Sequence, residues 1–81
     1  MLWIMSITPA QSRAARGLVA MTQASLAKTS GVSLRTIAHF ESAERRLIPA
    51  NLAAIRTALE SAGVIFTDGD APGVKLRTRE G

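Results

Sequence analysis

Apolar and polar positions follow a helical period through the middle of the chain. The clearest repeat is Leu52, Ile55 and Leu59, whose i, i+3, i+7 spacing predicts a helix with one buried face. Ile37 and Phe40 stand three residues apart and predict the buried face of a shorter helix. The pattern therefore predicts a mainly helical protein.

Side chains that cap helices precede these apolar runs. Thr8, Thr22 and Ser33 can each accept a hydrogen bond from the first helical turn that follows, and Gln11 completes a capping box with Thr8. Gly31 can adopt the positive φ that ends one helix and begins a tight turn. The predicted helices are residues 9–19, 23–29, 34–43 and 49–62.

After Gly63 the period changes from helical to alternating. Residues 64–67 and 74–77 predict two strands, and the turn-forming residues 68–73 between them predict a hairpin with a six-residue loop. The apolar run Met1–Ile7 predicts a strand or a packed arm. The expected organisation is an arm at 1–7, a helical domain at 8–63, a hairpin at 64–77 and a frayed tail at 78–81.

Composition removes several classes of function. The 81 residues are enough for one small domain and include no cysteine, which excludes disulfides and thiolate metal sites. His39 is the single histidine and cannot build a metal site alone, so we expect no metal and no cofactor. The sequence shows no nucleophile–base pair, and we expect no enzyme activity.

Charge points to an anionic partner. The net charge of +4 favours DNA, RNA or an acidic membrane surface over a neutral partner. Few aromatic side chains argue against a binder of single strands. The apolar run at the N-terminus is too short to span a membrane and has no basic flank, so we expect a cytoplasmic protein without a membrane segment.

Residues 22–41 have the spacing of a helix-turn-helix. Ala27 is small and lies four positions before Gly31, where two helices would cross closely. Ile37 and Phe40 would pack back onto the preceding helices and fix the angle of the third one. That angle lets the third helix enter the major groove of DNA.

Residues 11–63 resemble the XRE family of phage-repressor and Cro-like transcriptional regulators. The residues that carry the resemblance are Arg13, Arg16, Thr22, Gln23, Leu26, Ala27, Gly31, Val32, Ser33, Ile37, Phe40 and Glu41. The resemblance implies a mainly α, four-helix, lambda-repressor-like domain, here with a short C-terminal β-hairpin and an apolar N-terminal arm.

The resemblance also implies roles for particular side chains. The positions expected to face base edges are Leu34, Arg35 and His39. The positions expected to meet DNA phosphates are Gln23, Ser33, Arg45 and Arg46. Arg16 and Glu41 match a pair that forms an internal salt bridge in many relatives. Simple solvent exposure is an alternative reading for Arg35, for His39 and for the Arg45–Arg46 run.

Three departures from the family pattern leave questions open. Ala20 and Ala43 stand where relatives often have glycine, which leaves the ends of two helices open by a residue or two. The C-terminal segment predicts strands where many relatives have a fifth helix, which leaves the mode of dimerisation open.

The sequence therefore predicts a regulator that binds double-stranded DNA in a sequence-specific manner. The leading hypothesis is a repressor that acts as a homodimer on a partly palindromic operator, joined through Met1–Ile7, the strands after Gly63, or both. One alternative is an antitoxin-type autoregulator with a protein partner at the C-terminal strands. Another is a protein-only anti-activator module.

Overall fold

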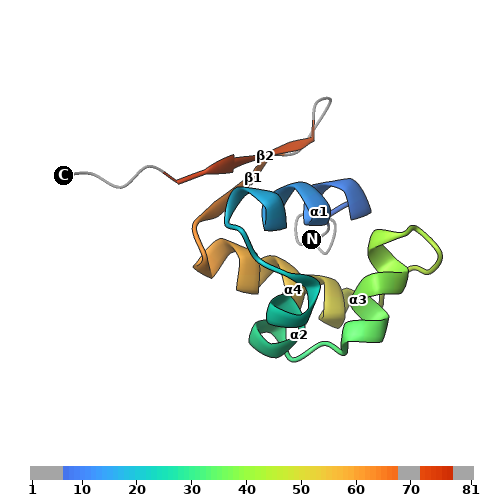
Figure 1. Cartoon of the computed structure of the whole chain (residues 1–81). Coiled ribbons are helices and arrows are strands. Elements are labelled where there is room, and N and C mark those ends of the chain that lie inside the picture. Colours follow the sequence, from blue (N-terminus) through green and yellow to red (C-terminus); the bar gives the residue numbers. More distant parts are fainter. Residues whose placement is uncertain (1–6, 68–71, 78–81) are drawn as a thin grey trace.

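Four helices and one antiparallel hairpin form the part of the chain that the structure describes, residues 7–67 and 72–77 of a computed structural model (Figure 1). The elements are α1 (Pro9–Leu18), α2 (Gln23–Ser30), α3 (Leu34–Glu41), α4 (Pro49–Ser61), β1 (Val64–Thr67) and β2 (Gly73–Leu76). The prediction of a mainly helical domain with a C-terminal hairpin is confirmed. Most of the predicted arm and all of the predicted tail lie outside the described residues.

The first three helices begin at the predicted caps. Thr8 accepts a 3.0 Å hydrogen bond from the Gln11 backbone N–H, and the Gln11 side chain accepts a 2.9 Å bond from the Thr8 backbone N–H, which completes the capping box. Thr22 and Ser33 cap α2 and α3 by accepting bonds from the backbone N–H groups of Ser25 and Thr36. No side chain caps α4, which has Pro49 in its first turn.

Three helices end earlier than predicted, and in two of them an alanine just past the end adopts a left-handed backbone. The helix predicted to reach Val19 ends at Leu18, and the helix predicted to reach residue 43 ends at Glu41. Ala20 has φ 54° and Ala43 has φ 65°. The family resemblance implied glycine at these two positions, and glycine adopts this conformation without steric strain. The other two helices end at Ser30 and Ser61, each one residue from its predicted end.

The first strand of the hairpin lies where it was predicted, and the second is shifted by one residue. Gly73 pairs with Thr67, so it belongs to β2 and not to the loop that was predicted to include it. Arg77 lies just past β2, although its backbone N–H still donates to the Gly63 carbonyl. The hairpin lies along α1 on the side away from α2 and α3 (Figure 1).

The core lies where α1, α2, α3 and α4 meet the inner face of β1. Its largest fully buried apolar side chains are Leu26, Ile37, Ile55, Leu59 and Val64. The predicted stripe of α4 supplies two of them, while its third member, Leu52, is only partly buried. Ile7, predicted to belong to the arm, is also buried in this core. None of the described helices is both long and apolar enough to cross a membrane.

Candidate nucleic-acid interface

The turn between α2 and α3 depends on the backbone of Gly31. Gly31 has φ 77°, and its N–H donates to the Ala27 carbonyl at 2.9 Å, which closes α2. A Cβ atom at this position would meet nothing within 4 Å. Glycine is therefore favoured by conformation and not by space. Ser33 caps α3 only two residues later.

α3 is buried on one side and exposed on the other. Ile37 is fully buried and Phe40 is 4% exposed, and both belong to the core. Arg35 is exposed on the other side of the helix, and Leu34, in the first turn, is 48% exposed. The packing of the first pair therefore fixes the direction in which the second pair faces solvent, as the spacing predicted.

The exposed side of α3 and the loop after it share one concave surface. The hollow of this surface has a volume of about 470 Å³. Its lining residues are Arg35, Thr36, His39, Arg45, Arg46, Leu47, Ile48 and Asn51. Four of the seven side chains predicted to contact DNA thus come together on it. The lining includes three arginines and no acid. Glu44 stands at the margin, with Oε1 3.9 Å from His39 Nε2.

Gln23 and Ser33, two of the predicted phosphate ligands, lie at the starts of α2 and α3 and already have partners in the protein. The Ser33 hydroxyl accepts a bond from the Thr36 N–H and donates to the Thr36 hydroxyl at 2.8 Å. Gln23 Nε2 donates to Glu41 Oε1 at 3.0 Å. An amide nitrogen has two hydrogens, so this bond leaves one for a further acceptor.

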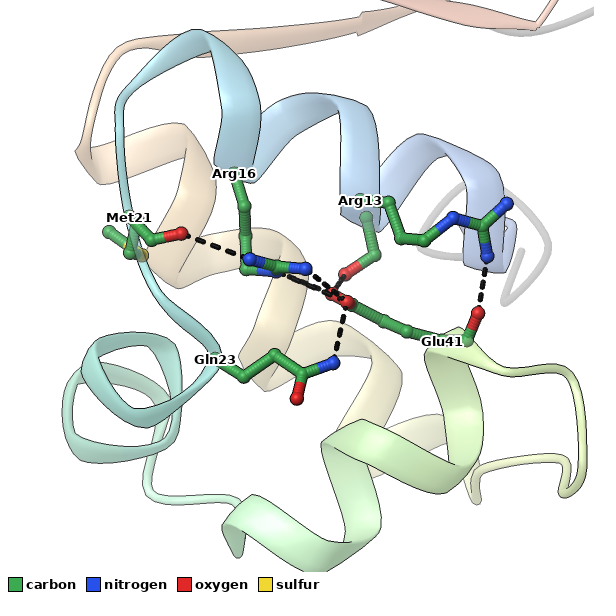
Figure 2. Close-up of polar contacts among 6 residues, drawn as sticks. Arg13, Arg16, Met21, Gln23 and Glu41 are labelled. Atoms are coloured by element: carbon green, nitrogen blue, oxygen red, sulfur yellow. Dashed lines mark hydrogen bonds and ion pairs between the residues drawn. The ribbon is translucent and has the colours of Figure 1, made fainter.

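Glu41 lies at the centre of a hydrogen-bond network that joins three helices (Figure 2). It is 2% exposed. Its carboxylate accepts bonds from Arg16 Nη2 at 2.7 Å, from Ser12 Oγ at 2.5 Å and from Gln23 Nε2 at 3.0 Å. Arg13 donates to the Glu41 carbonyl. The structure thus brings Arg16 and Glu41 together as an internal pair.

A comparison with families of known proteins matches the helix-turn-helix model to residues 13–62, more than half of the chain. The chain belongs to the XRE-type helix-turn-helix family. This family comprises DNA-binding regulatory domains and not enzymes. A comparison with curated proteins finds no match.

The match covers most of the helix-turn-helix domain and excludes the hairpin. It includes α2, α3 and α4 and the part of α1 that holds Arg13 and Arg16. β1 and β2 lie beyond its end at residue 62. The family assignment therefore supports double-stranded DNA as the ligand of this domain and leaves the hairpin without an assigned role.

The network around Glu41 sets its charge state in the helix-turn-helix domain. Burial by itself raises the pKa of Glu41, but hydrogen bonds from Arg16, Gln23 and Ser12, with the charge of Arg16, lower this pKa further than burial raises it. The bond to Glu41 in turn raises the pKa of Arg16 above its ordinary value. Both groups are therefore charged at neutral pH, and the pair persists.

Sequence reasoning missed four residues of the concave surface, Thr36, Leu47, Ile48 and Asn51. Asn51 carried a readable signal, because it is the polar residue in the apolar stretch from Leu47 to Ile55 and lies in the first turn of α4. Thr36 follows Arg35 directly and was hidden by its role in the cap of α3.

Proposed function

We propose that this protein is a cytoplasmic, sequence-specific transcriptional repressor that binds a partly palindromic operator as a homodimer. The observation that carries the proposal is the concave surface of α3 and its following loop. Cationic side chains gather on that surface, while the opposite side of α3 is locked into the core. A rigid helix with an outward cationic face is what insertion into a major groove requires.

Base contacts are proposed for Leu34, Arg35 and His39. Arg35 and His39 are four residues apart, so they lie one above the other along α3 and can reach neighbouring base pairs. The guanidinium of Arg35 can donate two bonds to the O6 and N7 atoms of guanine. Leu34 is exposed and apolar, which fits contact with a thymine methyl group.

Phosphate contacts are proposed for Arg45, Arg46, Gln23 and Ser33. The two arginines lie in the loop after α3 and share its concave surface, so they can reach the backbone beside the groove. Gln23 and Ser33 lie at the starts of α2 and α3, where backbone N–H groups and the helix dipole favour a phosphate. These contacts would set position and affinity more than sequence preference.

A homodimer would place two copies of α3 in successive major grooves about 34 Å apart. Bound at a promoter, such a dimer would block access of RNA polymerase. A DNA with only one half-site would bind the protein more weakly, because one copy would supply only half of the contacts.

Selection of binding sites from random duplex DNA tests this proposal directly. The full chain is expected to enrich a motif with two related half-sites separated by one helical turn. Arg35→Ala is expected to lose the preference at one position in each half-site. Lys75→Ala removes the same charge from β2 and serves as the matched control, with an unchanged motif. Uniform, salt-sensitive binding without a motif would contradict sequence-specific regulation.

A further inference from the structure

One edge of the strand β2 pairs with no other strand that the structure describes. Arg77 donates its N–H to the Gly63 carbonyl, which continues the register that pairs Lys75 with Ile65. Bonded and non-bonded pairs alternate along an antiparallel ladder. The backbone N–H and C=O groups of Val74 and Leu76 therefore point away from β1. Across the described part of the chain the sheet has two strands, so these groups face no third strand.

An apolar strip of α1 lies beside this edge. Gln11 joins α1 to the hairpin, because its Nε2 donates to the Thr67 carbonyl at 3.0 Å and to the Gly73 carbonyl at 3.1 Å. Ala14 and Leu18 lie three and seven positions after Gln11, on the same side of the helix. Both are exposed, Leu18 to 41%. A strand added to β2 would thus have apolar side chains beneath it.

Charge at the edge disfavours a second copy of the chain as the occupant. Lys75 and Arg77 are exposed on the outer face of the hairpin, and neither α1 nor β2 contains an acid. Antiparallel self-pairing centred on Lys75 would place two lysines opposite each other, and pairing centred on Leu76 would oppose Lys75 and Arg77. Like charges in these positions are destabilising. Pairing nearer the start of β2 meets Pro72, which has no N–H to donate.

We propose that the edge of β2 binds an extended segment of another protein whose side chains alternate between acidic and apolar. The segment would add a third strand through the backbone groups of Val74 and Leu76. Side chains of an added strand alternate between the two faces of the sheet. Its acids would lie beside Lys75 and Arg77, and its apolar side chains would cover Leu18 and Leu76, which is 52% exposed.

This site is separate from the DNA-binding surface. The hairpin lies on the side of α1 away from α3 (Figure 1). A partner strand on β2 therefore leaves Arg35 and the rest of the concave surface open. The regulator would hold DNA and its protein partner at the same time.

Titration of the isotope-labelled full chain with a short synthetic peptide that alternates glutamate and valine tests the proposal. The amide signals of Val74 and Leu76 are expected to shift and to gain protection from hydrogen exchange. A peptide of the same composition with its glutamates and valines in two separate blocks is expected to bind at least about tenfold more weakly, because its net charge is equal but its pattern does not match the edge.

Two variants separate the edge from general electrostatic attraction. Leu76→Pro removes one outward N–H and keeps the Lys75 and Arg77 pairings, so peptide affinity is expected to fall about tenfold while operator binding is unchanged. The double variant Lys75→Glu, Arg77→Glu keeps the backbone intact and is expected to prefer a peptide that alternates lysine and valine.

Three results would overturn the proposal. One is absence of peptide binding at millimolar concentration. Another is equal binding of the alternating and block peptides. The third is a wild-type dimer that dissociates on Leu76→Pro, measured by sedimentation, which would assign the edge to a second copy of the chain.

Discussion

Arg16 on α1 and Glu41 at the end of α3 form a 2.7 Å ion pair in which the Glu41 side chain is 1% exposed and the Arg16 side chain 20%. The pair fixes α1 against the helix that would read DNA. Because Glu41 also accepts bonds from Ser12 and Gln23, its loss would leave several donors without their acceptor.

Glu41→Gln is expected to lower the free energy of unfolding by about 2 kcal/mol, because the partly buried charge of Arg16 loses its counter-charge. Urea denaturation at neutral pH measures the change. Glu44→Gln alters an exposed acid three residues away and is expected to change the free energy by less than about 0.5 kcal/mol. Equal effects of the two substitutions would rule out a special role for the Glu41 network.

The wild-type chain is expected to lose stability in acid. The pKa of Glu41 is lower in the folded protein than its ordinary value of 4.5, so the folded state favours the ionised acid. This contribution is complete above the ordinary pKa and is lost as pH falls below 4.5 through the lowered folded pKa. Unfolding curves recorded from pH 7 downward should show this loss, and Glu41→Gln should show a smaller dependence on pH over the same range.

Ala20→Gly and Ala43→Gly are each expected to raise the free energy of unfolding by about 1 kcal/mol. Both alanines have a positive φ, which places Cβ near a carbonyl oxygen, and glycine has no Cβ. Ala14→Gly in the middle of α1 is the control and should lower stability by about 1 kcal/mol. Thermal unfolding of the three variants checks the opposite signs. Destabilisation by all three would show that the left-handed alanines are not strained.

Arg35→Ala and Arg46→Ala are expected to weaken DNA binding in different ways. Loss of Arg35 should reduce discrimination at one base pair by about 1–3 kcal/mol. Loss of Arg46 should weaken binding to all sequences alike. It should reduce the dependence of log K on log salt by about two units, one for each copy in the dimer. Fluorescence anisotropy at several salt concentrations, on the selected operator and on one-base variants, distinguishes the two. Identical behaviour of both variants would count against the assigned roles.

Gln11→Glu is expected to lower the free energy of unfolding by about 2 kcal/mol. A glutamate keeps the capping box with Thr8 but cannot donate to the Thr67 and Gly73 carbonyls. Hydrogen exchange should therefore accelerate more in the hairpin than in the first turn of α1. Gln11→Ala is the comparison, and it should loosen both regions. Uniform loosening by Gln11→Glu would contradict a separate role for its amide nitrogen.

Local features of this fold could be read from the sequence because their causes are local. Thr8, Thr22 and Ser33 cap helices through bonds that span three residues, and Gly31 makes its turn through its own backbone. The apolar spacing of Ile37 and Phe40 likewise predicted which side of α3 is buried. These signals predicted the helix-turn-helix and the exposed position of Arg35.

Contacts between distant segments could not be read in the same way. Gln11 was understood only as part of a cap, whereas its amide nitrogen also bonds carbonyls 56 and 62 residues away. Ser12 carried no signal, yet its hydroxyl bonds Glu41 across 29 residues. Such bonds depend on how the elements pack, and the residue types alone do not specify them.

The length of α3 limits how long a DNA sequence one copy of the protein can recognise. Eight residues of helix span about 12 Å, close to four base pairs of DNA. Four base pairs have about 256 possible sequences, whereas a genome offers on the order of a million or more binding positions. The sequence that a single copy recognises would therefore occur thousands of times in the genome. Selective binding to one promoter therefore needs a second copy or a partner that lengthens the recognised sequence.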